Sequence, residues 1–444
     1  MVFHPPPPAE TRDPARAAPA AAERPTEPLE PVRRLTPLGQ ALIHYNQTLL
    51  PLPVESIATE QALNRCLAEA PLAAIDLPSF TQSAVDGYAL LSFETQWASP
   101  THPVQLRVIG EIAAGPWRED PPPLAGHMAY RILTGGRIPR GVDTVVAQEQ
   151  AQVEGDSIRL EAPVPEKRNI RYAGEELKRG DALAAAGQRI SPGMLAALMA
   201  AGTHTIKAYR RPRVSVLVTG DEVVAAGQLP SEGQVHDANG PLIRSWMQAL
   251  GYPPPQVSYI KDVRTEVESA LCTALDQSDL VITTGGVSVG DRDYLPQAAA
   301  ACGVRQVFWK VAQKPGKPLY YGLRGQTPLL ALPGNPAAVL VGLVIHARRV
   351  LDCLEGVATP GPRMSAGRLL QPVKADPLRD RLLRMNLSIN TEGQVQLEPL
   401  PKQDSHMLSN LATAMALVML PAREQPYAAG ERVLWTPLPG VTRI

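Results

Sequence analysis

Cysteine, aromatic side chains and net charge are all scarce in this chain of 444 residues. The four cysteines lie far apart without a C-x-x-C pair, and the eight histidines are equally scattered, so we expect free buried thiols and neither a disulfide nor a zinc site. Lys and Arg total 43 and Asp and Glu also total 43, which is not the basic excess of a nucleic-acid-binding protein. No apolar run reaches the ~18–20 residues of a membrane span. The N-terminus lacks the hydrophobic region of a secretion signal, which favours a cytoplasmic protein.

Proline is plentiful by contrast, and a segment rich in Pro and Ala covers residues 1–34. This segment holds almost no large apolar side chains, so we expect a disordered tail. The remaining chain is longer than the ~250–300 residues at which single cores stop growing, which predicts several domains. We expect a discontinuous N-terminal helical and linker domain (35–78 and 165–207), a small β-domain inserted into it (79–164), an α/β domain (208–360) and a C-terminal β-domain (361–444).

Strand and helix patterns alternate between residues 208 and 355. The predicted strands are 214–219, 256–260, 280–284, 306–310 and 329–332, and the predicted helices are 239–250, 263–276, 294–301 and 335–354. Such alternation predicts a doubly wound, mainly parallel sheet covered on both faces, with ligands binding at the carboxyl ends of the strands. Outside this region we expect helices at 36–50, 60–66 and 192–201, and short strands at 104–109, 129–133, 144–148 and 157–160.

A glycine loop after the predicted strand 280–284 is the first candidate for an anion site. Gly285, Gly286 and Gly290 allow close backbone approach, and Ser288 adds a hydroxyl group. Consecutive amides in such a turn form an anion-binding concavity, although a strand-to-helix turn would need glycines in any case. The loop is neither a Walker motif nor GxGxxG, so it supports neither a P-loop NTPase nor a Rossmann reductase.

A helix start and a lysine pair are two further candidates. Asn335 follows Pro333 and Gly334 and precedes another proline, as at a helix N-terminus, where free amides attract phosphate. A helix start without a ligand would show the same residues. Lys314 and Lys317 lie on a proline-bounded turn, and two ammonium groups on a stiffened loop suit a phosphate or a tetrahedral oxyanion. A solvated surface loop is the alternative.

Acidic residues lie beside these candidate sites. They are Asp221 and Glu222, after Thr219 and Gly220 at one strand end, and Asp291 and Asp293, within and after the glycine loop. Carboxylates near phosphates are usually bridged by a divalent cation, which indicates Mg²⁺. A helix N-cap is the alternative role for Asp291.

Three turns in the N-terminal half carry further polar residues. Asp86 precedes a glycine in SFTQSAVDGYA, Thr134 precedes two glycines in RILTGGRIPRG, and Glu175 lies in NIRYAGEEL. Singly, each is typical of an ordinary turn, so these residues alone leave a functional role open.

Eight segments nevertheless occur together in one order. They are SAVDGYA, LTGGRIPRGVDTVVAQE, NIRYAGEE, VTGDE, HDANG, TTGGVSVGDRDY, KPGKP and LPGNP. In this order and spacing, over roughly residues 35–444, the chain resembles the MoeA family, which includes the gephyrin E domain. The resemblance implies a molybdopterin molybdenumtransferase, which joins molybdate to the dithiolene of adenylylated molybdopterin and releases AMP in a Mg²⁺-dependent step, giving molybdenum cofactor.

The resemblance also implies an assembly. Family members are elongated homodimers of four-domain chains, with a molybdopterin-binding α/β domain and a C-terminal β-barrel-like domain. Their active cleft lies between the α/β domain of one subunit and the region that bears Asp86 and Thr134 in the other. We also expect transient contact with the molybdopterin adenylyltransferase and with cofactor-accepting enzymes.

Residue roles follow from the matching motifs. The implied catalytic residues are Asp86, Thr134, Glu175, Glu222 and Asp293. The implied pterin-binding residues are Thr219, Gly220, Asp221, Gly285, Gly286, Ser288, Gly290, Lys314, Lys317, Pro333, Gly334 and Asn335. The implied Mg²⁺ ligands are Asp221, Asp291 and Asp293, and the implied molybdate-binding residues are Lys314, Lys317, Arg384 and Ser405.

The chain departs from the family pattern at Thr81, Gln82 and Gly240, which affects details of pterin contact rather than the class. One alternative is a molybdopterin adenylyltransferase, which shares the α/β domain, but the additional β-domains argue against it. Another is a non-catalytic molybdopterin-binding or scaffold protein, as in receptor-clustering members of the family. The filled acidic and lysine positions favour an enzyme.

Overall fold

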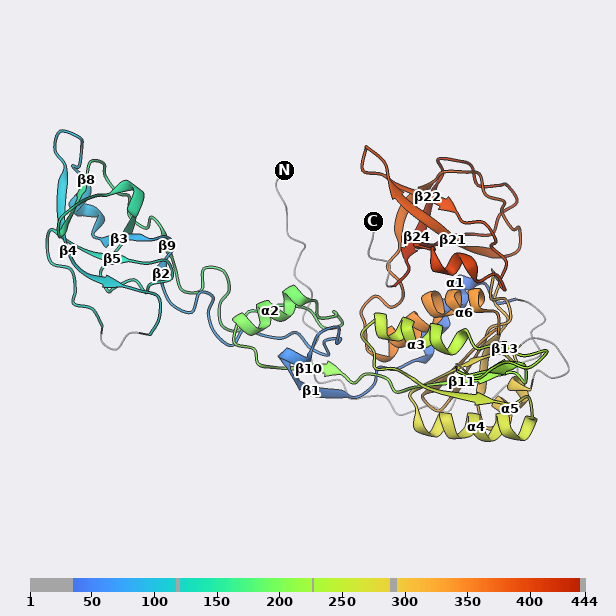
Figure 1. Ribbon diagram of the computed structural model, residues 1–444. Helices are drawn as coiled ribbons and strands as arrows, with labels where there is room; N and C mark the ends of the chain where they lie inside the picture. The colour runs from blue at the N-terminus through green and yellow to red at the C-terminus, as the bar shows by residue number, and fades with distance from the viewer. Residues whose placement is uncertain (1–34, 117–119, 226, 288–293, 440–444) are drawn as a thin grey trace. The chain divides into compact units, whose positions relative to one another are not determined.

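The computed structural model describes residues 35–116, 120–225, 227–287 and 294–439 (Figure 1). The predicted disordered tail, residues 1–34, lies outside this part. So do four predicted site residues of the glycine loop: Ser288, Gly290, Asp291 and Asp293. In the described part, no helix is long and apolar enough to cross a membrane.

A six-stranded sheet in the order β14-β11-β15-β19-β18-β16 forms the centre of the α/β domain (Figure 1). The strands are β11 (Val214–Thr219), β14 (Gln256–Ile260), β15 (Leu280–Thr284), β16 (Arg305–Trp309), β18 (Tyr320–Arg324) and β19 (Thr327–Leu332). The first four in sheet order are parallel, whereas β18 runs antiparallel to both of its neighbours. The prediction of a mainly parallel sheet is confirmed, although β18 was missing from it.

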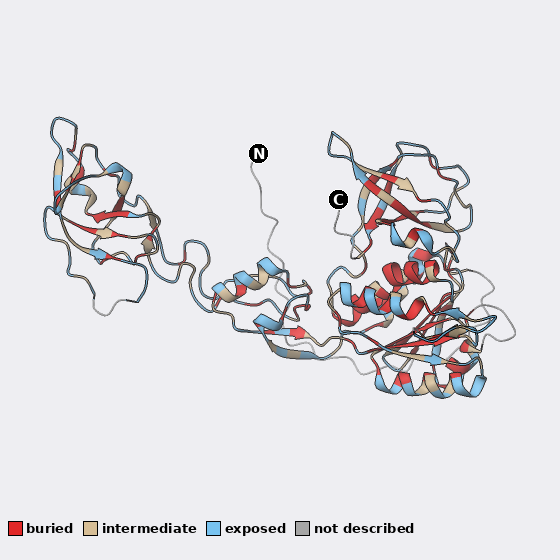
Figure 2. Ribbon diagram, in the orientation of Figure 1, coloured by how far each residue is buried: buried red, intermediate tan, exposed pale blue. Residues whose placement is uncertain are grey.

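Helices cover both faces of this sheet. The helical elements are α3 (Asn239–Ala249), α4 (Arg264–Gln277), α5 (Leu295–Ala301), α6 (Pro336–Val341), the π-helix η4 (Gly342–Ala347) and α7 (Arg348–Leu354). Successive strand residues alternate between the faces, so Leu280 and Ile282 pack in a core with α3, η4 and α7, while Val281 packs with α4 and α5. Figure 2 shows the buried sheet between exposed outer helix surfaces. α1 (Leu38–Thr48) packs in the first of these cores.

A second six-stranded sheet, in the order β6-β3-β5-β4-β8-β7, builds the small β-domain. Its strands are β3 (Gly87–Leu90), β4 (Val104–Ile112), β5 (Met128–Ile132), β6 (Thr144–Ala147), β7 (Gln152–Glu154) and β8 (Ser157–Leu160). The pair β2 (Gln82–Ser83) and β9 (Ile170–Arg171) is antiparallel. The four strands predicted here are confirmed, with ends that differ by up to three residues.

The C-terminal sheet closes on itself. Its strands are β17 (Gln313–Lys314), β20 (Ser365–Leu369), β21 (Asp380–Ile389), β22 (Val395–Pro399), β23 (Ala416–Leu420) and β24 (Arg432–Pro437). β23 pairs with both β24 and β21, so five of the strands form a closed barrel and β17 attaches to β21. The predicted β-barrel-like domain is therefore confirmed.

The rest of the N-terminal region contains β1 (Val54–Ala58), paired with β10 (Thr205–Tyr209), and α2 (Pro192–Ala200). The prediction of a helix at 60–66 is wrong. A single turn of 3₁₀ helix, Thr59–Gln61, is followed by turns, and Asn64 has a positive φ of 62°. That left-handed conformation ends any helix, and Asn adopts it more readily than most residues.

Cys272 on α4 and Cys302, directly after α5, form a disulfide with their Cα atoms 5.4 Å apart. The expectation of free thiols is therefore wrong for this pair, whereas Cys66 and Cys353 are free and buried. The two bonded cysteines are 30 residues apart in sequence. They meet because α4 and α5 pack together, which residue spacing does not reveal.

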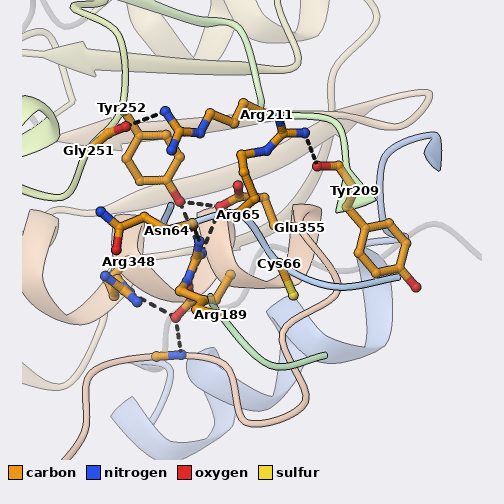
Figure 3. A network of polar contacts seen from close by, with 12 residues as sticks. Asn64, Arg65, Cys66, Arg189, Tyr209, Arg211, Gly251, Tyr252, Arg348 and Glu355 are labelled. Atoms are coloured by element: carbon orange, nitrogen blue, oxygen red, sulfur yellow. Dashed lines mark hydrogen bonds and ion pairs between the residues drawn. The ribbon is translucent and has the colours of Figure 1, made fainter. Parts of the chain in front are cut away.

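Arg189 is the centre of a buried polar network (Figure 3). Its Nη2 atom donates to Asp352 Oδ1 at 2.6 Å, to Glu355 Oε2 at 2.7 Å and to the Tyr252 hydroxyl at 3.1 Å. Both carboxylates are almost completely buried, and Arg348 also pairs with Asp352. Buried carboxylates without such partners would cost several kcal/mol each, so this network holds the segment around Arg189 against α7.

Candidate functional site

The carboxyl ends of β11, β15 and β19 meet at one edge of the α/β sheet. The Thr219 hydroxyl donates to the Thr284 carbonyl at 3.3 Å, and the Gly285 amide donates to the Leu332 carbonyl at 3.1 Å. The structure therefore brings the predicted strand-end motifs together. Gly334, two residues after β19, lies directly beside Gly285.

Gly285 could not be replaced by another residue without rearrangement. Its φ is +89°, and a Cβ atom there would lie 2.7 Å from both the carbonyl and the hydroxyl oxygen of Thr219. The glycine thus gives the backbone a conformation and a close approach that other residues rarely permit. Gly286 also has positive φ, so the described start of this loop exposes backbone rather than side chains.

The HDANG segment (236–240), one of the eight motifs, is joined to this edge. Asp237 accepts hydrogen bonds from the amides of Asn239 and Gly240 and from the Tyr259 hydroxyl. The Asn239 side chain donates to the Gly334 carbonyl at 2.7 Å. Its Oδ1 atom is buried without a hydrogen-bond partner among the described residues, so it is an available acceptor beside the glycine loop.

Two exposed carboxylates follow β11. Asp221 accepts a hydrogen bond from the Asp262 amide at 3.1 Å, and Glu222 lies over Gly220. The described residues contain no cluster of three His, Cys, Asp or Glu side chains that could hold a metal ion. Carboxylate oxygens are the ligand type that Mg²⁺ prefers, so Asp221 and Glu222 fit part of such a site, and the remaining predicted ligands lie in the part that is not described.

A cavity of about 360 Å³ lies beside the lysine loop, defined here as residues 313–318. Lys314, Lys317, Asn335 and Ser405 all line it, so four predicted residues from distant parts of the sequence come together. Ser405 accepts a hydrogen bond from the Asn335 side chain at 2.8 Å. The cavity combines two exposed lysines with a hydroxyl and an amide, and one acidic residue, Asp404, also lines it. The excess of basic side chains suits a small oxyanion.

Arg379 and His406 also line this cavity, and neither was predicted. Arg379 is paired with Asp376, which accepts from its guanidinium at 2.8 and 3.0 Å, so its charge is partly offset. The sequence offered a weak signal for both residues, since each lies within five residues of a predicted one. Arg379 lies five residues before Arg384, and His406 directly follows Ser405.

Arg384 has a different position from the other predicted oxyanion-binding residues. Only 1% of it is exposed, and its Nη2 atom donates to the carbonyls of Lys402 and Asp404. Burial lowers the pKa of Arg384, and Asp404 opposes that change. The guanidinium therefore stabilises the loop 402–405, and Arg384 is not among the residues that line the cavity.

Asp86 and Thr134 form the second group of predicted residues, in the small β-domain. Asp86 Oδ1 accepts from both the amide and the hydroxyl of Thr134, each at 2.7 Å. These two hydrogen bonds lower the pKa of Asp86. Glu175 lies in another turn, where its carboxylate accepts from the Tyr172 amide at 2.7 Å.

A larger cavity, about 910 Å³, is lined by Arg189, Trp246 and Arg348 among others. None of the predicted site residues lines it. The chemistry of the predicted residues, rather than cavity size, therefore directs attention to the strand ends and the lysine loop.

Three family models match this chain. The MoeA N-terminal region (domain I and II) matches residues 36–202, a probable molybdopterin binding domain matches 215–352, and the MoeA C-terminal region (domain IV) matches 366–438. The chain is similar to a molybdopterin molybdenumtransferase of Staphylococcus aureus, with 32% identity over 406 residues, 90% of this chain and 95% of the relative. Its similarity to the Haemophilus influenzae protein of the same name is 34% over 396 residues, 88% and 95% of the two chains.

Solved structures give the same result. A crystal structure of a molybdopterin biosynthesis MoeA protein from Pyrococcus horikoshii superposes with a TM-score of 0.76 and 26% identity. The match covers 92% of this chain and all of that one. From its motifs, its fold and these relatives, this chain belongs to the MoeA family.

Proposed function

We propose that this protein is a molybdopterin molybdenumtransferase, which inserts molybdate into the dithiolene of adenylylated molybdopterin and releases AMP. The observation that carries the proposal is the cavity at the lysine loop. It places Lys314, Lys317 and Ser405 around a space of about 360 Å³. Molybdate is a tetrahedral dianion, and two ammonium groups with a hydroxyl donor match its charge and its hydrogen-bonding needs.

The pterin substrate belongs at the neighbouring strand ends. Gly285 and Gly286 expose backbone there, and Asn239 Oδ1 is a buried acceptor without a partner in the described residues. Ligands of open α/β sheets bind at this edge. The pterin dithiolene would then lie near the lysine loop, since Asn335 lines the cavity and Gly334 touches the glycine loop.

Mg²⁺ would be held by Asp221 and Glu222 together with Asp291 and Asp293. Bound there, it would offset the charge of the pyrophosphate and polarise the phosphorus for attack. Asp86, Thr134 and Glu175 would act from a second subunit of a homodimer, as the family resemblance implies. Metal insertion depends mainly on placing the reactants, and the residues named here position groups rather than supply a strong nucleophile.

Reconstitution tests this function. The purified protein is incubated with adenylylated molybdopterin, molybdate and Mg²⁺, and AMP release is measured together with activation of a cofactor-free molybdoenzyme. Molybdate-dependent AMP release with active cofactor is the expected result. Tight pterin binding without either product would contradict the transferase and favour a molybdopterin-binding protein.

A coupled form of the same assay tests the predicted partner enzymes. We infer a cytoplasmic protein that receives its substrate from the molybdopterin adenylyltransferase and passes its product to cofactor-accepting enzymes. Adding the adenylyltransferase and unadenylylated molybdopterin with ATP should then replace the adenylylated substrate. Sedimentation of the purified protein tests the homodimer, and a monomer at working concentration would contradict it.

A further inference from the structure

Three buried side chains connect the lysine loop to the protein interior. Gln313 Nε2 donates to the Gly316 carbonyl at 3.1 Å, Gln313 Oε1 lies 2.8 Å from His346 Nε2, and His346 Nδ1 lies 2.9 Å from the Tyr45 hydroxyl. None of the three residues is exposed to solvent. We call Tyr45, His346 and Gln313 the buried relay.

The directions of these hydrogen bonds follow from the amide of Gln313 and from the neutral state of His346. The amide nitrogen of Gln313 faces a carbonyl, so its Oε1 atom must accept from the N–H group at His346 Nε2. Burial lowers the pKa of His346 to about 3, so its imidazole is neutral, and the proton on Nε2 leaves Nδ1 without one. His346 Nδ1 therefore accepts from the Tyr45 hydroxyl.

The relay ends between the two lysines of the candidate site. Gln313 directly precedes Lys314, and Gly316 directly precedes Lys317. Gly316 has a φ of +91°, and a Cβ atom there would lie 2.7 Å from Gln313 Nε2. The glycine thus permits a close contact between the amide of Gln313 and the turn. Both lysine side chains are exposed. The turn that carries them is held by the hydrogen bond between the buried Gln313 side chain and the Gly316 carbonyl.

The first two residues of the relay lie far from the lysine loop in the sequence. Tyr45 lies on α1, 301 residues before His346, which lies in the π-helix η4. π-Helical segments are rare and occur frequently at functional sites. Here the π-helix η4 carries His346, a polar residue that is completely buried.

We propose that Tyr45, His346 and Gln313 are positioning residues for the oxyanion substrate, because they fix the turn from which Lys314 and Lys317 reach the cavity. The proposal rests on the proposed function of that cavity. A lysine is a flexible point charge, so two lysines bind a small dianion well only when the backbone that carries them is held in place. A satisfied polar network with a purely structural role is the alternative.

The chain offers a matched pair of variants that separates these roles. Tyr45 and Tyr321 are both fully buried, their rings are 4.6 Å apart, and each hydroxyl has a hydrogen bond to a side chain. The Tyr321 hydroxyl bonds to Thr48 at 2.8 Å and not to the relay. Tyr45→Phe and Tyr321→Phe each remove one such bond from the same core, but only Tyr45→Phe breaks the relay.

Molybdate binding to the full-length protein is measured by calorimetry for the wild type and both variants. Tyr45→Phe should raise the Kd for molybdate roughly three- to tenfold, as expected for the loss of one net hydrogen bond, while Tyr321→Phe should leave it unchanged. Gln313→Leu, which removes the bond to Gly316 itself, should raise the Kd at least as much. Equal effects of the two tyrosine variants would overturn the proposal.

Amide hydrogen exchange gives a readout that is independent of substrate. The amides of Lys310, Val311 and Leu319 are hydrogen-bonded within or beside the loop, so a peptide covering residues 310–320 reports on its order. Exchange in this peptide should be faster in Tyr45→Phe and Gln313→Leu but not in Tyr321→Phe. A wild type that binds no molybdate would overturn the proposed function, and this exchange difference would remain. A wild type that binds molybdate no more tightly than Tyr45→Phe would overturn the positioning role alone.

Discussion

The side-chain amide of Asn335 donates a hydrogen bond to the hydroxyl oxygen of Ser405 at 2.8 Å, although 70 residues separate them in the sequence. The Ser405 carbonyl also accepts from the Ala337 amide at 3.2 Å. The start of α6 and the loop after β22 are therefore fixed to each other. Residues of both segments line the cavity beside the lysine loop.

Ser405→Ala should weaken molybdate binding about tenfold, because it removes a hydroxyl from the cavity wall and leaves the Asn335 amide without its acceptor. The free energy of unfolding should fall by only about 1 kcal/mol, since the site is solvent-accessible. Calorimetry with molybdate and urea unfolding measure the two effects.

Ser388→Ala is the matched control, because Ser388 is an exposed serine on β21 of the same barrel. It should change neither quantity. If the Ser405→Ala and Ser388→Ala variants bind molybdate equally well, Ser405 is not part of the binding site.

Lys317→Ala should abolish metal insertion and leave the fold intact. The Lys317 side chain is exposed at the cavity, so its truncation removes a positive charge without opening a hole in the core. Molybdate-dependent AMP release measures the loss, and circular dichroism checks the fold. Lys207→Ala removes another exposed charge, whose partner is Glu69, and it should be fully active. Wild-type turnover in Lys317→Ala would contradict the assignment of the lysine loop.

Three apolar strands of the α/β domain could be predicted from the sequence with their correct first and last residues. Strands 214–219, 256–260 and 280–284 were predicted as the structure has them. β18 was not predicted, and it contains Gly322, a residue type that is depleted in strands. In the structure a Cβ atom at Gly322 would lie 2.6 Å from Val304, so this glycine allows close packing inside a strand.

Contacts between distant segments could not be predicted in the same way. Local motifs indicated Lys314, Lys317 and Asn335 one by one, whereas Ser405 was predicted only from the resemblance to a family, which also grouped the four. Tyr45 and His346 lie in ordinary helical patterns, and nothing in those patterns indicates that their side chains meet. Side-chain pairing across a core depends on how helices pack, which a single sequence does not encode in its spacing.

Thr134→Val should raise the pKa of Asp86 toward its ordinary value. The Thr134 hydroxyl is one of two donors to the same carboxylate oxygen, and the backbone amide remains as the other. Asp86 in the wild type stays charged to lower pH, because its pKa is lowered by these bonds. The acidic limb of the pH profile of kcat/KM should therefore move to higher pH in the variant.

Thr101→Val serves as the control, since Thr101 is an exposed threonine of the same domain with local partners. Its pH profile should match that of the wild type. An unchanged acidic limb in Thr134→Val would show that the charge of Asp86 is not required.

Burial of neutral His346 should make the protein less stable in acid. Its pKa is lowered from 6.5 to about 3, so between these values the unfolded chain binds a proton that the folded protein does not. The stability from this group is complete above pH 6.5 and is lost as the pH falls toward 3. Between pH 7.5 and 5.0 the loss should be roughly 2 kcal/mol, measured as the free energy of unfolding in urea. His346→Gln keeps a polar side chain without the titrating group, so its stability should fall by roughly 2 kcal/mol less than that of the wild type over the same range. Parallel losses in both proteins would mean that other groups cause the acid sensitivity.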